Sequence, residues 1–180
     1  MDTYIAFLRG INVGGHKKVP MAQLRNVLEN EGFSKVRTYI QSGNVVFESD
    51  LDSKRALEEL IAQSIEKHFG FEVPVLIRTV KEIHEILANN PFDNDKDLAN
   101  NRIYFVLLSV IPEPKEVACL REEHYVNEQF KITDTCVYLC CKKGYGQAKL
   151  SSNLIERKLK VKATARNFRT MQKLLELSNR

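Results

Sequence analysis

The sequence contains no long hydrophobic run, because its longest apolar stretches, such as 103–108, have the length of a single strand. A helix that spans a bilayer requires about 20 consecutive apolar residues, so no segment is predicted to cross a membrane. The first residues also lack the basic region and long apolar core of a secretory signal. We therefore expect a cytoplasmic protein without a membrane partner.

Metal-ligand spacing is absent as well. The four histidines are scattered, and none lies at ligand spacing from another histidine or cysteine. We expect reduced, structural thiols, with Cys140 and Cys141 on opposite faces of one strand. Asp93, Asp95 and Asp97 alternate, but the glycine and glutamate of a calcium loop are missing. The sequence therefore predicts neither a metal nor another cofactor.

Signatures of several enzyme and binding classes are also missing. No G-x-S-x-G elbow of a hydrolase is present. The first half does not carry the basic, glycine and aromatic signature of an RNA-recognition sheet. These absences leave the question of an enzymatic activity open.

The charge is distributed unevenly along the chain. Hydrophobic residues make up 43% and charged residues 28% of the sequence, which is typical of a soluble globular protein. The segment 142–180 holds 11 Lys and Arg but only two acidic residues, whereas the segment 1–141 holds 16 basic and 21 acidic residues. A basic C-terminal fifth favours an anionic partner. The alternative is a solvated face that packs on the acidic remainder.

The first half alternates strand-like and helix-like patterns. An apolar run at 4–8 predicts a strand, and the segment from Pro20 to Gly32 has helical spacing. The segment 36–47 is interrupted by Gln41-Ser42-Gly43-Asn44, which predicts a hairpin. A second amphipathic helix over 57–69 and a strand over 73–77 follow. The order is βαββαβ.

The second half repeats this order of elements. We expect strands at 103–108, 130–132 and 136–141, helices at 112–121 and 150–159, a short strand at Val161 and a final helix that carries Phe168. The predicted fold is α+β: a tandem pair of ferredoxin-like (βαββαβ) units with antiparallel sheets, plus a C-terminal helix. The predicted parts are a first half at 1–79, a helix and linker at 80–101, and a second half with a basic C-terminal helix at 102–180.

Chain direction predicts that two polar segments of the first half converge. A right-handed crossover makes the first two strands of such a unit parallel, and the third runs back beside them. The end of the first strand and the hairpin turn then lie at the same end of the sheet. We therefore expect the segment 9–15 to lie near the segment 41–44.

The first of these segments superficially resembles a phosphate-binding loop. Gly10 and Gly15 have the Walker spacing, but His16 follows and no Ser or Thr is placed to hold magnesium. An NTPase is therefore not predicted. Backbone amides with Arg9, Lys17 and Lys18 beside them could still receive an anion. The alternative is a tight structural turn with solvated lysines, and the same alternative holds for the polar residues of the hairpin.

A third motif, at 164–170, is predicted to begin the last helix. With Thr164 as N-cap, Arg166 and Asn167 fall in the first turn. Positive side chains oppose the helix dipole there, but together with free N–H groups they favour an anion. Arg166 and Arg169 would share a face and clamp that anion. The alternative is that they pair with acidic residues of the fold.

These motifs together resemble the bacterial family known as domain of unknown function 1697. The resemblance covers nearly the whole chain and rests on the segments 7–15, 41–47, 144–146 and 164–170. It implies two ferredoxin-like halves and no established activity. A Ser-Lys-Leu of the family is replaced here by Ala148-Lys149-Leu150, so any chemistry of that serine is not expected in this chain.

Three functional hypotheses follow. The first is a cleft that binds an anionic small molecule, such as a nucleotide or phosphorylated metabolite, or a nucleic-acid backbone. The second is an enzyme acting on a phosphorylated or carboxylated small molecule, which the lack of His, Asp or Glu in the three motifs disfavours. The third is a scaffold for protein interactions. The candidate ligand-binding residues are Arg9, Gly10, Asn12, Gly14, Gly15, Lys17, Gln41, Ser42, Asn44, Arg166, Asn167 and Arg169.

Overall fold

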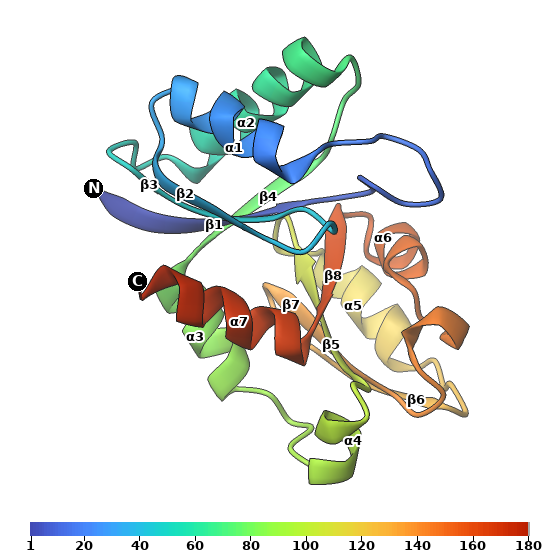
Figure 1. The fold of residues 1–180 in the computed structure, drawn as a ribbon. Helices are drawn as coiled ribbons and strands as arrows, with labels where there is room; N and C mark the ends of the chain where they lie inside the picture. The colour runs from blue at the N-terminus through green and yellow to red at the C-terminus, as the bar shows by residue number, and fades with distance from the viewer. Residues whose placement is uncertain (180) are drawn as a thin grey trace. The chain divides into compact units, whose positions relative to one another are not determined.

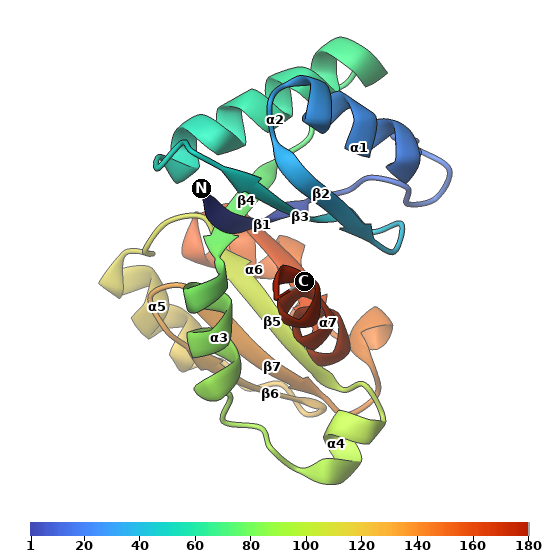
Figure 2. The same ribbon diagram turned by 60° about the vertical axis from the view of Figure 1, so that its left-hand side comes forward.

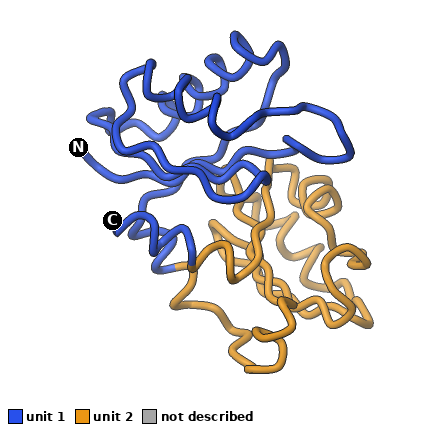
Figure 3. The backbone as a smooth tube through the Cα atoms, viewed as in Figure 1, with its two compact units in different colours: residues 1–85, 173–180 blue, residues 86–172 orange. Residues whose placement is uncertain are grey.

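The computed structural model describes residues 1–179 and contains two four-stranded antiparallel sheets with helices packed on them (Figure 1). The chain divides into two compact units (Figure 3). Unit 1 comprises residues 1–85 and 173–180, and unit 2 comprises residues 86–172. No helix within the described residues is long and apolar enough to cross a membrane. The two sheets and the helices packed on them confirm the predicted mixed α+β class.

Unit 1 runs in the order strand, helix, strand, strand, helix, strand. These elements are β1 (Asp2–Leu8), α1 (Met21–Asn30), β2 (Ser34–Tyr39), β3 (Asn44–Ser49), α2 (Lys54–Phe69) and β4 (Val75–Thr79). The strands pair in the order β2-β3-β1-β4, and every pair is antiparallel. Helices α1 and α2 cover one face of this sheet (Figures 1 and 2). A third helix, α3 (Val80–Ala88), follows β4 directly.

Alternation along β1 places every second side chain in the core beneath α1 and α2. These core residues of β1 are Tyr4, Ala6 and Leu8. The helices contribute Leu24 and Ile61, which are fully buried. Burying one such side chain stabilises the fold by roughly 1.5–3 kcal/mol, so this core firmly holds the strands from which the loops of unit 1 extend.

Unit 2 has a sheet of the same strand order. Its elements are α4 (Asp95–Ala99), β5 (Ile103–Leu108), α5 (Pro114–Arg121), β6 (Glu128–Ile132), β7 (Cys136–Cys141), the 3-10 turn η1 (Tyr145–Gln147), α6 (Ser152–Leu159), β8 (Ala163–Asn167) and α7 (Phe168–Ser178), whose end belongs to unit 1. The order β6-β7-β5-β8 repeats that of unit 1 position by position. Helices α5 and α6 share one core with this sheet, to which Leu120 and Ile155 contribute.

The last strand lies later in the chain than the sequence predicts. We expected it at Val161, but Lys160 takes a left-handed conformation with φ of 55° and ends α6. Backbone pairing with the sheet then begins at Lys162, whose carbonyl accepts from Ser109 N at 2.8 Å. The strand therefore extends to Asn167.

All four cysteines of the described chain are free thiols. Cys141 lies in the core of unit 2, and burial raises the pKa of its thiol to about 12. Cys140 is buried on the opposite face of β7, as the alternation of a strand predicts. Cys119 of α5 is exposed, so only three of the four cysteines have the buried, structural position that we expected.

Candidate functional site

The glycine loop, which we define as residues 9–18, begins where β1 ends. Its three glycines all have positive φ angles, between 57° and 78°, a region that other residues seldom occupy. Arg9 follows β1 directly, and its backbone N donates to Pro74 O at 3.0 Å, next to the last β1–β4 pair, Leu8 with Val75. His16 N donates to Val13 O at 3.0 Å, which makes a tight turn at the tip of the loop. The glycines therefore allow the backbone to adopt the positive φ angles of this loop.

The hairpin turn, residues 40–43 between β2 and β3, contacts the base of the glycine loop. Leu8 N donates to Gly43 O at 2.7 Å. A Cβ atom on Gly43 would lie 2.6 Å from Leu8 Cβ and 2.9 Å from Ile11 Cδ1. The predicted convergence of these two segments is thereby confirmed, and it requires a glycine at position 43.

Asn12 holds the glycine loop to both of its neighbours. Its Nδ2 donates to Gln41 O at 2.9 Å and to Val19 O at 3.0 Å, and its Oδ1 accepts from Val19 N at 2.8 Å. The backbone of Asn12 has a φ of 55°, which asparagine tolerates better than most residues, and its N–H donates to Lys17 O. The polar atoms of this candidate ligand-binding side chain are thus engaged within the fold.

The glycine loop carries three cationic side chains and no acidic residue. Lys17 Nζ donates to the backbone carbonyl of Glu72 at 2.6 Å and lies 5.9 Å from the centre of the Phe71 ring. Lys18 is exposed, and Arg9 is partly exposed. The charge of the loop is therefore not neutralised by an acidic residue of its own.

The polar residues of the hairpin serve its geometry. Asn44 is fully buried, and its Nδ2 donates to Tyr39 O at 3.0 Å and to Ser42 Oγ at 2.9 Å. Gln41 and Ser42 are exposed at the tip. The structural reading therefore holds for Asn44, whereas Gln41 and Ser42 are accessible from solvent.

The prediction that Thr164 caps the last helix is wrong. Thr164 is a buried residue of β8, and α7 begins at Phe168. The side chain at the start of α7 that accepts a backbone hydrogen bond is Asn167, whose Oδ1 accepts from Thr170 N at 2.8 Å. Asn167 therefore caps α7 and precedes its first turn, in which the sequence had placed it.

The two arginines of this motif do not form the expected helical clamp. Arg166 lies on β8, is 9% exposed and donates to Thr164 Oγ1 and Ala165 O at 2.9 and 2.8 Å. Burial lowers the pKa of its guanidinium to about 10. Arg169 lies on α7, and its Nη2 donates to Ala99 O at 2.6 Å. Since one is on a strand and the other on a helix, the helical i, i+3 spacing does not apply to them.

Comparison with known proteins places the chain among its relatives. The sequence profile described as "Protein of unknown function (DUF1697)" matches residues 1–138. The chain belongs to this family. A solved structure, "conserved bacterial protein SP0830 from Streptococcus pneumoniae", is 27% identical, with a TM-score of 0.76 over 98% of each chain. A search of curated proteins finds no match.

Three lysines of the basic C-terminal segment of this DUF1697 protein pair with acids of unit 2. Lys160 Nζ lies 2.6 Å from a Glu116 carboxylate oxygen, and Lys158 pairs with Glu123. Lys142 pairs with Asp97. These acids all precede the basic segment in the chain. For these three lysines the structure bears out packing on the acidic remainder, the alternative that the charge asymmetry left open.

The sequence patterns missed two further sets of charged residues. A buried acid, Asp97, is 5% exposed and pairs with Arg102 at 3.1 Å and with Lys142. These hydrogen bonds lower the pKa of the Asp97 carboxyl, and the bond from Lys142 has the largest effect. The other is Arg78 of β4, which pairs with β1 in the same register as Arg166 with β5 in unit 2. Only a residue-level alignment of the two halves could have pointed to Arg78.

Asp97→Asn is expected to lower the free energy of unfolding at pH 7 by about 2 kcal/mol, because two charged hydrogen bonds are lost. The pKa of Asp97 is lower in the folded state than in the unfolded state. Its carboxylate therefore contributes its full stabilisation at a pH above the unfolded-state pKa, which is about 4. This stabilisation is lost as the pH falls through the folded-state pKa. Urea unfolding should show the difference from wild type shrinking below pH 4. Asp95→Asn, at an exposed site of the same helix, should change stability little. A pH-independent difference would contradict the ionic role.

The described residues contain no group of three or more His, Cys, Asp or Glu side chains that could hold a metal ion. Within the glycine loop His16 is exposed, and neither of the other two motifs contains a histidine or a carboxylate. The arrangement can therefore bind through backbone amides and cations, and His16 is the one His, Asp or Glu side chain within these three segments that could act as a general base.

Proposed function

We propose that this protein binds a phosphate-bearing ligand at the glycine loop of unit 1. The observation that carries the proposal is a loop with three cationic side chains, no acid and three positive-φ glycines, held on the sheet by Asn12 and Gly43. Consecutive backbone N–H groups in such a loop form anion-binding concavities. A loop held in place beforehand loses less conformational entropy when a ligand binds.

The proposed residues are fewer than the sequence predicted. Arg9, Lys17 and Lys18 supply charge, Gly14 and Gly15 supply accessible backbone, and Gln41 and Ser42 supply neutral polar groups at the adjacent turn. Arg166 is not included, because its guanidinium is buried and bonded to its own strand. Asn12, Asn44 and Asn167 act through the geometry of the fold.

We further propose that each unit is ferredoxin-like, with halves at 1–79 and 102–180. The support is the βαββαβ order, the antiparallel sheet order β2-β3-β1-β4 and its repetition as β6-β7-β5-β8. In such a unit the first strand is central, so the loop that follows it lies beside the hairpin turn. The fold thus accounts for the position of the proposed anion site.

The test is a thermal-shift titration with inorganic phosphate and pyrophosphate. Wild type should melt at a higher temperature as either anion is added, because a ligand that binds only the folded state stabilises it. The double variant Lys17→Ala/Lys18→Ala should lose most of this shift. The matched control is Lys81→Ala, an exposed lysine of α3 at the opposite end of the sheet.

Two results would decide against the proposal. Either no anion shifts the melting of wild type, or the double variant responds as the Lys81→Ala protein does. Binding to generic RNA or DNA with a steep loss on added salt, and no response to phosphate or pyrophosphate, would replace the small ligand by a nucleic-acid backbone.

A further inference from the structure

The edge strand β6 of unit 2 presents backbone groups that the sheet does not use. Thr133 N donates to Cys136 O, and Lys142 N donates to Asn127 O, which fixes the phase of the β6–β7 pairing. Odd-numbered residues of β6 therefore bond to β7, and even-numbered residues point their backbone outward. The N–H and C=O of Phe130 thus have no partner within residues 1–179.

The ends of this open edge are already fixed. Glu128 N donates to Tyr125 O at 3.3 Å, and Arg121 Nη2 donates to Ile132 O at 3.4 Å. The Ile132 N–H, like the Phe130 backbone, faces outward without a described partner. The two ends of β6 thus have hydrogen-bond partners on their outward side, whereas the backbone groups of Phe130 in the middle do not.

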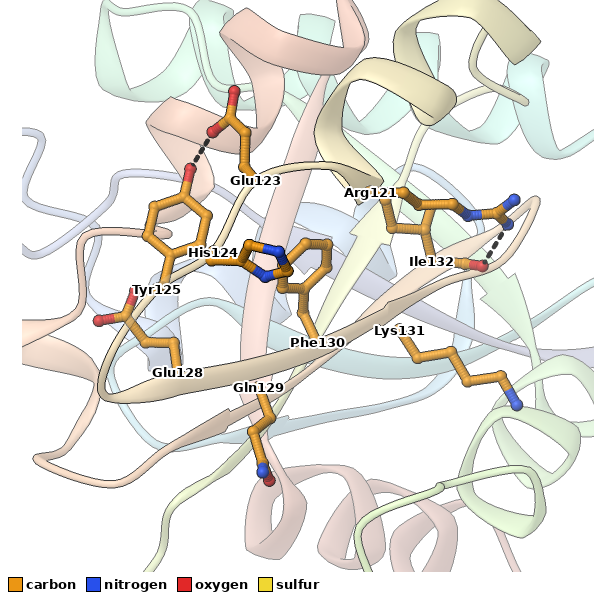
Figure 4. A pocket seen from close by; sticks show the side chains of 9 residues that line it. All are labelled: Arg121, Glu123, His124, Tyr125, Glu128, Gln129, Phe130, Lys131 and Ile132. Atoms are coloured by element: carbon orange, nitrogen blue, oxygen red, sulfur yellow. Dashed lines mark hydrogen bonds between the residues drawn. The ribbon is translucent and has the colours of Figure 1, made fainter.

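A cavity of about 570 Å³ lies beside the edge. Figure 4 shows Phe130 and His124 in its middle, between Tyr125 on one side and Arg121 on the other. Gln129 and Lys131 extend from the opposite side of the strand to Phe130 (Figure 4). A side chain carried by an added strand would therefore have space next to the Phe130 ring.

Among the residues that line this cavity, the side-chain charge that remains available is positive. Glu123 is bonded to Lys158 and to the Tyr125 hydroxyl, and these bonds lower the pKa of its carboxyl. Glu128 is buried, and its carboxylate accepts from two backbone amides, those of residues 149 and 150. Arg121 and Lys131, by contrast, have no carboxylate partner in the described chain. An acidic segment would meet two cations here.

Two of the other outer strands, β4 and β8, use a side-chain carboxylate to cover an outward backbone donor. On β4 the outward N–H of Ile77 donates to Glu58 Oε1 at 2.8 Å. On β8 the outward N–H of Ala163 donates to Glu156 Oε1 at 2.8 Å. A side-chain carboxylate thus covers an outward donor on each of those edges, a common protection of edge strands. The middle of β6 lacks this cover.

We propose that β6 binds an extended acidic peptide segment as a fifth strand of the unit 2 sheet. The free N–H and C=O of Phe130 pair with the backbone of the segment, alternate side chains enter the cavity beside Phe130, and Arg121 and Lys131 attract its carboxylates. Pairing with a second copy of the chain is disfavoured by Lys131 on the exposed edge. The proposal does not depend on the anion site of unit 1.

The test uses two capped synthetic octapeptides, (Glu-Val)4 as probe and (Lys-Val)4 as control. Fluorescence anisotropy should detect binding of the acidic probe only, and added salt should weaken it. Amide hydrogen exchange should slow at Phe130 and Ile132 in the complex. Lys131→Glu should weaken binding about fivefold, the upper end of the range for one exposed ion pair. Lys162→Glu, beside the opposite edge strand β8, should bind as wild type does.

Four results would overturn the proposal. The first is no binding of the acidic peptide, and the second is equal binding of the basic one. The third is binding without slower exchange at Phe130 and Ile132. The fourth is slower exchange at these amides with rising protein concentration and no peptide, which would identify a second copy as the occupant.

Discussion

Gly43→Ala is expected to lower the free energy of unfolding by about 3 kcal/mol, because two costs add. An alanine at a φ of 78° adopts a conformation that side chains with a Cβ seldom take. Its Cβ would also lie 2.6 Å from Leu8 Cβ and 2.9 Å from Ile11 Cδ1. Leu8 and Ile11 are fully buried core residues, so they cannot yield without repacking. Urea unfolding monitored by circular dichroism measures the effect.

Gly15→Ala separates the two costs. Gly15 has the same φ of 78°, but a Cβ there meets no atom within 4 Å. It should therefore lose only about 1 kcal/mol, the cost of the left-handed backbone alone. If the free energy of unfolding fell equally in both variants, the close packing of the hairpin turn against Leu8 and Ile11 would not contribute to stability. In that case the turn would not hold the glycine loop as we describe.

The meeting of the two polar segments could be predicted because it depends on chain direction alone. An apolar strand at 4–8, a helix and a hairpin at 36–47 leave few antiparallel arrangements. In the structure, β3 pairs with both β1 and β2, which brings the hairpin turn to the end of β1. Patterns of a few residues were enough for this step, because core burial is encoded in the period of the apolar residues.

The start of α7 could not be predicted in the same way. Thr164 and Asn167 are both favourable N-cap residues, so the local sequence does not choose between them. The choice is made by pairing of β8 with β5, which keeps residues up to Asn167 extended. The roles of the two arginines follow from this tertiary pairing. The same limit applies to Asp97, whose burial and partners depend on Arg102 and Lys142.

Asn12→Ala is expected to lower the free energy of unfolding by about 2–3 kcal/mol, because three side-chain hydrogen bonds are lost. The loop then loses its connections to the hairpin turn at Gln41 and to the start of α1 through Val19. Amide exchange at His16 and Val19, whose N–H groups are bonded to Val13 O and Asn12 Oδ1, should become faster. The thermal shift by pyrophosphate should shrink, since a looser loop loses more entropy on binding. Urea unfolding and exchange measured on the same sample test both parts.

Two further variants at this position decide which property of asparagine matters. Asn12→Gly keeps the positive φ without strain but makes none of the three bonds, so it should be nearly as unstable as Asn12→Ala. Asn12→Asp keeps the acceptor for Val19 N but directs a carboxylate oxygen at the carbonyls of Val19 and Gln41. It should therefore be destabilised as well. A fully stable Asn12→Asp would mean that the two donated bonds do not hold the loop, and the pre-ordered anion site would lose its main support.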